Sequence, residues 1–317
     1  MQVHQLRYFV AVAELRHFTR AAAEVGVTQP ALSKQIHVLE SELGARLFHR
    51  ERGNITLTEA GDILLPLASS ILADVNSVHS RVQELVGLRR GRLRLGATPS
   101  LCTTLVAPLL HDYRTQYPGI ELVIEENGSQ DLVGELSRGR LDLALLVSPH
   151  ERSDASLPTE PILDEPLVLA SAMHGPSELP ARISPAELRL HPLVMFRPGY
   201  DLRQTTIDLC ARHGFAPTFA IEGGEMDAVL SFVEAGIGVA VVPRMVLTRH
   251  PNLRVTELDT SDARRTIALA HRREAVLPHT ALAFRTMLHS SLVRAAERGE
   301  LAAGVTLVSP DFAGARS

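Results

Sequence analysis

Four polar residues recur along residues 28–43 with the spacing of a single helix face. Gln29, Ser33, Lys34 and His37 would lie side by side on an α-helix. Amide, hydroxyl, ammonium and imidazole groups are the ones that proteins direct at phosphates and at the edges of bases. An ordinary solvated helix can show the same pattern, so its meaning depends on the elements around it.

The segments before this helix have the periodicity of two more helices. Apolar residues at i, i+3, i+4 and i+7 predict a first amphipathic helix. Its buried stripe is Leu6, Phe9, Val10 and Ala13. We expect Thr19 to cap a second helix that buries Ala22 and Ala23. Gly26 follows, and its backbone freedom suits a sharp turn between two helices.

The third helix has its own start, stop and buried face. Thr28 is expected to cap it, Pro30 lies in its first turn, and Gly44 is expected to end it. The inward-facing positions step by four, three and four, and are Leu32, Ile36, Leu39 and Leu43. Three short helices in this order, with a glycine turn before a capped third helix, indicate a helix-turn-helix over about residues 18–37.

A basic hairpin is expected shortly after the third helix. Arg50 and Arg52 precede Gly53–Asn54, a pair typical of tight hairpin turns, and Ile55 and Leu57 alternate after it. The pattern predicts a two-stranded wing with arginines at its tip. Such arginines can contact phosphates or the minor groove of DNA.

The run FTRAAAEVGVTQPALSKQIHVLESELGARLFHRERGNITLTEAG resembles the DNA-binding domain of LysR-type transcriptional regulators, and the resemblance extends over about residues 4–62. It implies that the third helix enters the major groove of double-stranded DNA and that the wing lies beside it. The implied DNA contacts are Thr28, Gln29, Pro30, Ser33, Lys34, Arg50 and Arg52, with His37 on the same face. Family members often carry arginine where this chain has Lys34. Because lysine lacks the bidentate fork of arginine, phosphate contact is favoured over base readout there.

A long amphipathic helix is expected next, with Thr58 at its start. Its apolar residues recur at alternating steps of four and three, the seam of a coiled coil. The seam residues are Leu64, Ala68, Ile71, Val75, Val78, Val82 and Leu85. The helix could pack on its own domain, but we favour a partner helix, and the LysR resemblance also implies dimerisation here. Pro66 weakens the helix prediction for residues 59–66 only.

The rest of the chain alternates short apolar runs with helical patterns, which indicates an α/β domain. Strands are expected over 92–97, 120–126, 141–147, 165–171, 191–196, 217–223, 236–243, 253–258 and 265–273, and helices over 99–117, 129–138, 201–213, 225–235 and 279–299. The last strand and helix are expected to return to the first set. This organisation resembles the periplasmic-binding-protein fold and the two-lobed effector domain of LysR-type regulators. The stretches that match best are DLALL (142–146), GYDLR (199–203) and EAGIGVAVVP (234–243).

Polar residues gather where these strands and helices meet. In two-lobed folds a ligand lies between the lobes, near helix N-termini. The candidate effector-binding residues are Thr98, Ser100, Ser129, Ser148, Phe196, Tyr200, Arg203 and Glu222. Arg203 would clamp a carboxylate, so a small organic anion such as an amino acid or hydroxy acid is the expected effector. The alternative is that Arg203 pairs with Asp201, Asp227 or Glu225 on the surface.

Other chemistries have little support in the sequence. The 14 histidines show no metal-ligand spacing and no nucleophile motif is present, so we expect no metal, cofactor or catalytic residue. Cys102 and Cys210 fall in different lobes, which argues against a disulfide switch and fits a reducing compartment. With a net charge of −4, no signal peptide and no apolar span, the chain is expected in the cytoplasm, with its DNA contact confined to a local surface.

These features predict an effector-controlled, sequence-specific transcriptional regulator. The expected parts are a winged helix-turn-helix (1–58), a linker helix and hinge (59–90), an effector domain (91–298; lobe I about 91–161 and 267–298, lobe II about 162–266) and a loose tail (299–317). Expected partners are double-stranded DNA, a second copy in a homodimer or homotetramer, the effector and RNA polymerase, without membrane contact. The alternative is a solute-binding or enzymatic α/β domain that uses the N-terminal helices for partner contact; the missing signal peptide and catalytic motif count against it.

Overall fold

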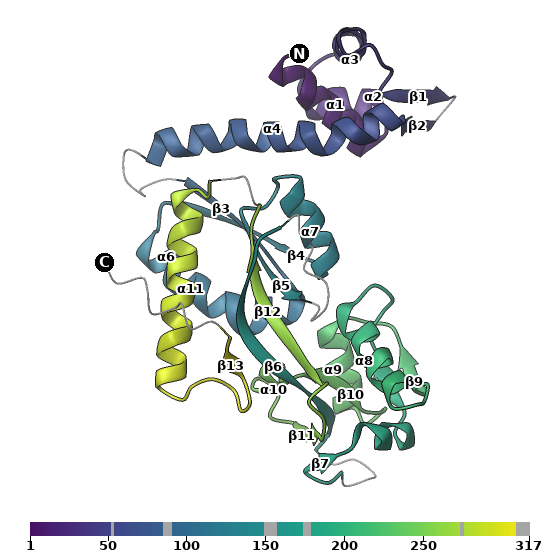
Figure 1. Ribbon diagram of the computed structural model, residues 1–317, viewed down its shortest axis with the longest axis vertical. Helices are drawn as coiled ribbons and strands as arrows, with labels where there is room; N and C mark the ends of the chain where they lie inside the picture. Colours follow the sequence, from purple (N-terminus) through teal and green to yellow (C-terminus); the bar gives the residue numbers. More distant parts are fainter. Residues whose placement is uncertain (52–53, 85–90, 149–156, 174–178, 273–275, 309–317) are drawn as a thin grey trace.

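The computed structural model describes residues 1–51, 54–84, 91–148, 157–173, 179–272 and 276–308. A small helical head lies above a long helix, and two α/β lobes lie below that helix (Figure 1). This is the mixed architecture expected from the sequence. Within these ranges, no helix is long and apolar enough to cross a bilayer.

The head consists of three helices and a hairpin. In chain order these are α1 (Val3–Leu15), α2 (Phe18–Glu24), α3 (Gln29–Leu43), β1 (Phe48–Glu51) and β2 (Asn54–Leu57). The two strands pair antiparallel, as expected for a wing. Phe9, Leu32 and Ile36 are fully buried between the helices. Phe48 packs its ring against Phe9, with ring centroids 5.4 Å apart, so the hairpin is anchored to the helical core.

The second helix differs in two details from the sequence prediction. His17, rather than Thr19, caps it, because its Nδ1 accepts a hydrogen bond from the backbone N–H of Arg20 at 3.4 Å. The buried face is shifted as well: Ala21 is fully buried and Ala23 is exposed. The prediction for Ala23 was therefore wrong, since the helix begins before Thr19 and turns a different side toward the core.

The ends of α3 and of the wing also differ slightly. Leu43, expected on the buried face, is 43% exposed. It is the last residue before Gly44, whose φ of 68° ends the helix as predicted, and it lies beyond the edge of the head's core. Asn54 was predicted in the hairpin turn, but it already belongs to β2, where it pairs with Glu51.

Helix α4 (Glu59–Glu84) starts directly after Thr58, as expected. The hydroxyl of Thr58 accepts a hydrogen bond from the backbone N–H of Gly61 at 3.1 Å. The first part of α4 packs on the head: Ala68 is fully buried, and Leu64 packs against the same core. Ala68 therefore cannot lie in a seam between two subunits. That prediction was wrong because the head covers this side of the helix.

Lobe I is built on one end of a nine-stranded sheet, in the order β4–β3–β5–β12–β6. Its strands are β3 (Gly91–Ala97), β4 (Ile120–Glu126), β5 (Leu143–Ser148), β6 (Thr159–Ala172) and β12 (Arg264–Ala270). Its helices are α5 (Pro99–Leu101), the π-helical turn η1 (Cys102–Val106), α6 (Ala107–Gln116), α7 (Ser129–Ser137) and α11 (His279–Glu297). β3 pairs parallel with both β4 and β5, which brings their carboxyl ends to one edge.

Part of lobe II continues the same sheet, and two of its strands form a separate parallel pair. Its elements are β7 (Arg182–Ile183), the 3₁₀ turn η2 (Pro185–Leu190), β8 (Leu193–Met195), α8 (Asp201–Arg212), β9 (Phe219–Glu222), α9 (Met226–Glu234), β10 (Ala240–Pro243), α10 (Arg244–Leu247) and β11 (Leu253–Leu258). Strand β6 pairs with β12 over 159–166 and with β10 and β11 over 167–172. The long strands β6 and β12 thus run between the two lobes (Figure 1).

The segment after α11 packs on lobe I. The short strand β13 (Thr306–Leu307) pairs antiparallel with β6, and Val305 is buried in the core of lobe I. The prediction of a loose tail over 299–317 was wrong for this part. The segment has no helical or strand periodicity in its sequence, but Val305 still packs into the core of lobe I. Residues 309–317 lie outside the described ranges.

Candidate functional site

The outer face of α3 carries the helix residues that the sequence assigned to DNA. Exposed on it are Thr28, Gln29, Pro30, Lys34 and His37, with Ser33 half-buried. Nδ1 of His37 lies 3.3 Å from Oε2 of Glu40. Oε1 of the buried Glu40 accepts a hydrogen bond from the backbone N–H of Leu47 at 2.9 Å, just before the wing. These contacts hold α3 and the wing in a fixed relation, as a surface that must match DNA requires.

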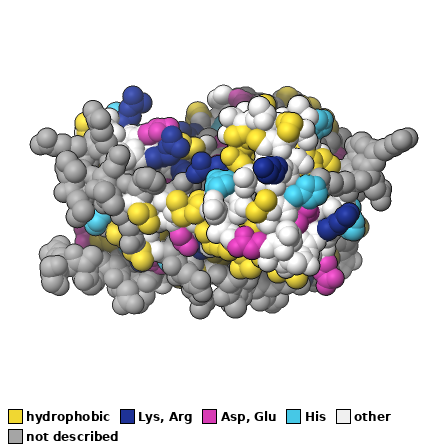
Figure 2. All heavy atoms as spheres, turned by 90° about the horizontal axis from the view of Figure 1, so that it is seen from above, with side chains coloured by type: hydrophobic (Ala, Val, Ile, Leu, Met, Phe, Trp, Pro, Cys, Tyr) yellow, Lys and Arg dark blue, Asp and Glu magenta, His cyan; other side chains and the backbone are white. Residues whose placement is uncertain are grey.

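The wing is present, but its tip cannot be described. Arg50 lies in β1 opposite Ile55, although its side chain is outside the described part, and so is all of Arg52. Both remain predicted DNA contacts. Figure 2 looks onto the molecule from above, where basic, acidic and histidine side chains are interspersed with uncharged ones.

Helix α4 leaves an apolar row uncovered on its outer side. The row consists of Ile63, Leu67, Ile71 and Val78, whose exposures are 62, 57, 37 and 58%. Of the predicted seam, Ile71 and Val78 lie in this row and Val75 is half-buried. The side chain of Val82 and all of Leu85 are outside the described part of the chain. The exposed row begins one position earlier than the predicted seam, at Ile63 rather than Leu64.

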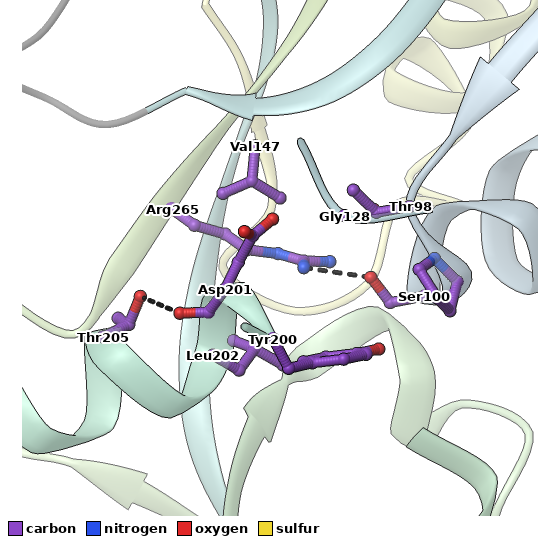
Figure 3. A pocket seen from close by; sticks show the side chains of 10 residues that line it. Thr98, Ser100, Gly128, Val147, Tyr200, Asp201, Leu202, Thr205 and Arg265 are labelled. Atoms are coloured by element: carbon purple, nitrogen blue, oxygen red, sulfur yellow. Dashed lines mark hydrogen bonds between the residues drawn. The ribbon is translucent and has the colours of Figure 1, made fainter. Parts of the chain in front are cut away.

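A small cavity lies between the lobes, with a volume of about 20 Å³ (Figure 3). Its walls are Thr98, Pro99, Ser100, Gly128 and Val147 from lobe I, Tyr200, Asp201, Leu202 and Thr205 from lobe II, and Arg265 from β12. The lobe I residues follow β3, precede α7 or end β5. This is the edge where the carboxyl ends of the parallel strands meet, as the sequence predicted.

Arg265 is the one basic residue among the described residues that line this cavity, and it was not among the residues predicted from the sequence. It is 4% exposed and faces Glu165, its partner across β12 and β6, which is fully buried. Nε of Arg265 donates to Oε2 of Glu165 at 2.9 Å, and Nη1 donates to the hydroxyl of Ser100 at 3.0 Å. Oε1 of Glu165 accepts the backbone N–H of Met245 at 2.7 Å. The available signal in the sequence was that a charged residue begins each of two apolar strand runs, EPLVLAS (165–171) and RTIALAHRR (265–273).

Three buried polar atoms around the cavity have no hydrogen-bond partner among the described protein atoms. They are the hydroxyls of Thr98 and Tyr200 and Nη2 of Arg265, which lies 2.8 Å from Glu165 without hydrogen-bond geometry. Burial raises the pKa of Tyr200 well above its usual value, so its hydroxyl remains a donor. Buried donors are almost always satisfied, so their convergence here makes this cavity the candidate effector site.

The described residues that line the cavity do not include the other predicted effector residues, which are Ser129, Ser148, Phe196, Arg203 and Glu222. Phe196 stacks on Tyr200, with ring centroids 4.7 Å apart, and supports it from behind. Arg203 and Glu222 do not line the cavity: Nη2 of Arg203 donates to Glu222 at 2.7 Å, and Nη1 to the carbonyl of Phe196 at 2.9 Å. The proposed carboxylate clamp by Arg203 was therefore wrong, and its partner is none of the three acids considered. Ser148 ends β5, with its side chain outside the described part.

Neither cysteine lines the cavity. Cys102 lies half-buried in η1, where burial and the neighbouring Glu126 raise the pKa of its thiol to about 12. Cys210 is buried in the core of lobe II, and burial raises its pKa as well. Both groups are therefore held as thiols rather than reactive thiolates.

Two family models match the chain. Residues 3–62 match the bacterial regulatory helix-turn-helix protein, lysR family, and residues 87–293 match the LysR substrate binding domain. Together they cover the head and both lobes.

Individual relatives agree with these matches. The HTH-type transcriptional regulator YcgK of Bacillus subtilis is 30% identical over 94% of this chain and 97% of its own length. The hydrogen peroxide-inducible genes activator of Pectobacterium carotovorum is 29% identical over 86% of this chain and 90% of its own. Among solved structures, a full-length OxyR from Pseudomonas aeruginosa superposes with a TM-score of 0.72 at 27% identity, covering 92% of this chain and 94% of that one.

Proposed function

The chain belongs to the LysR family of bacterial transcriptional regulators and is a DNA-binding regulator with an effector-binding domain, and we propose that a small carboxylic acid in the inter-lobe cavity controls its operator binding. The observation that carries this proposal is the set of three buried donors that have no hydrogen-bond partner among the described protein atoms. A carboxylate accepts up to about four hydrogen bonds, so it can satisfy all three at once.

The DNA contact is proposed to come from α3 and the wing. The exposed Gln29 and Lys34 and the half-buried Ser33 face outward while the apolar side of α3 is fully buried. We propose that α3 enters the major groove and that Arg50 and Arg52 contact the backbone beside it.

Assembly is proposed to use the exposed row on α4. The row recurs along one side of the helix, where no described part of the chain covers Ile63, Leu67, Ile71 or Val78. Two such helices, packed through these rows, would form a homodimer that presents two heads to two half-sites. A dimer of dimers and contact with RNA polymerase are further proposals, as is a cytoplasmic location beside the chromosome. The proposed division is head 1–58, linker 59–90 and effector domain 91–298.

A regulator that senses peroxide through a thiol is the second candidate, since relatives include a peroxide-inducible genes activator. The positions of the cysteines argue against it. Neither lines the cavity, and burial raises the pKa of both thiols. We therefore propose that the chain acts by reversible binding, without catalysis or a metal.

The proposal is tested by a gel shift on the DNA upstream of the protein's own gene. The full-length protein is titrated alone and with a panel of small carboxylic acids, amines and neutral metabolites. We expect specific binding to this DNA, and a shift in its midpoint with one or more acids only. A response confined to amines or neutral compounds would contradict the proposal that the effector is an acid. Equal binding to this DNA and to unrelated DNA would contradict the proposed sequence-specific DNA contact.

A further inference from the structure

The N-terminus of α7 is occupied by a carboxylate from the other lobe. Asp201 is the first residue of α8 in lobe II, and it reaches Ser129, the first residue of α7 in lobe I (Figure 3 shows Asp201 at the cavity). Oδ2 of Asp201 accepts the Ser129 hydroxyl at 2.7 Å and its backbone N–H at 3.3 Å. The Ser129 hydroxyl in turn accepts the backbone N–H of Val147 at 3.1 Å. A helix N-terminus favours an anion, so this contact holds the lobes together.

The cavity behind this contact is too small for an organic acid. Its volume of about 20 Å³ admits about one water molecule. A carboxylic acid with several heavy atoms can reach the donors of Thr98, Tyr200 and Arg265 only if the lobes move apart. Because Asp201 and Ser129 bridge the two lobes beside these donors, their hydrogen bonds must stretch or break in that movement.

The other end of α7 touches the head and the linker helix. Gly139 follows α7 and lies so close to α4 that an added Cβ would be 2.1 Å from the Cβ of Ala73. Arg140 forms ion pairs with Glu14, near the end of α1, and with Glu135 on α7. One helix of nine residues therefore touches lobe II at its start and the head and α4 just beyond its end.

A second contact holds α4 to the same lobe. Arg272, just after β12, donates to the carbonyl and hydroxyl of Ser70 at 3.1 and 2.7 Å and pairs with Asp74. Since α4 is fixed at this point, a shift of α7 changes the fit at Gly139 and Arg140 rather than carrying α4 along with it.

We propose that the Asp201–Ser129 contact is a latch that holds the effector cleft shut, and that its release moves α7 against the head through Gly139 and Arg140. The proposal rests on the proposed function, because an acid in the cleft is what releases the latch. Asp201 acts as a tethered anion at the start of α7, so acid binding to Thr98, Tyr200 and Arg265 must supply the free energy that breaks its two hydrogen bonds to Ser129. Coupling through one short helix makes both ends respond together.

Hydrogen–deuterium exchange of the full-length protein, without DNA or ligand, tests the latch. Asp201→Ala removes a charge-assisted bond, so backbone amides over 127–133 are expected to exchange about tenfold faster. Amides over 8–16 and 70–78, where α1 and α4 meet the end of α7, are expected to exchange faster as well. Asp208→Ala makes the same charge change on the exposed side of α8 and is expected to alter none of the three segments.

The reverse direction is tested from the other end of α7. Gly139→Ala places a methyl group against Ala73 at a φ of 68°, and Arg140→Gln removes the pair with Glu14 without adding volume. Each is expected to speed exchange over 127–133 severalfold, because coupling is reciprocal. If Asp201→Ala leaves 127–133 unchanged, the latch is refuted; if 8–16 and 70–78 do not respond, the coupling is refuted. Operator binding and its acid response are measured separately, so a failure here is distinguishable from a failure of the proposed function.

Discussion

Replacing Tyr200 by phenylalanine should stabilise the protein, although Tyr200 is buried. The substitution removes a hydroxyl that no described protein atom satisfies and keeps the ring that stacks on Phe196. Burying a hydroxyl without a partner costs about 1–3 kcal/mol. The adjoining cavity has room for about one water molecule, which offsets part of that cost. We therefore expect Tyr200→Phe to raise the free energy of unfolding by about 1 kcal/mol, or about 2–4 °C in Tm for a domain of this size.

The measurement is thermal and urea unfolding of the full-length protein, with Tyr113→Phe as the matched control. The hydroxyl of Tyr113 is also buried, but it donates to the carbonyl of Thr280 at 2.9 Å. Its removal leaves a buried acceptor short of a partner, so the control should lose about 1 kcal/mol. If Tyr200→Phe is destabilised as much as Tyr113→Phe, the Tyr200 hydroxyl has a partner within the fold, and the argument that it is held for a ligand fails.

Three further outcomes test other parts of the account. Lys34→Ala should reduce the salt dependence of operator binding by about one to two units of log–log slope, because a dimer presents it twice; an unchanged slope would remove Lys34 from the interface. Leu67→Asp should dissociate the dimer in sedimentation whereas Leu190→Asp, a change at an exposed lobe II residue, should not, and an intact Leu67→Asp dimer would contradict the exposed row on α4. The pKa of Cys102 is raised to about 12 and Cys210 is buried, so both should react slowly with thiol reagents at pH 8. Micromolar peroxide should therefore leave DNA binding unchanged, and a rapid response to peroxide would favour the thiol sensor.

Local signals allowed much of the fold to be predicted from the sequence. Three short-range features each mark an element boundary within about a residue. They are Thr28 two residues before a proline, Gly44 after the last apolar residue of α3, and the alternation in the wing. Most strands of both lobes follow from apolar runs in the same way, but the first half of β6 and the two-residue strands β7 and β13 were not predicted. The residues on the outer face of α3 were found because helical period alone separates its two sides.

Features that depend on distant partners were not predictable in the same way. The pairing of Arg265 with Glu165 joins residues 100 positions apart, and their register is set by the whole sheet. The seam on α4 was displaced because a heptad pattern does not say whether its partner is a second chain or the head, and the head took Ala68. Arg203 was assigned to the ligand because its charge was visible, whereas its ion pair with Glu222 on the neighbouring strand was not.

The most direct test of the central claim is operator binding by the full-length protein as a function of acid concentration, in the wild type and in Thr98→Val. The substitution removes one of the three unsatisfied donors at nearly constant volume. The account predicts that the acid concentration needed to shift the operator midpoint is about tenfold higher for Thr98→Val than for the wild type. This factor corresponds to the loss of one hydrogen bond. An identical acid dependence in the two proteins would place the effector outside the inter-lobe cavity and contradict the account.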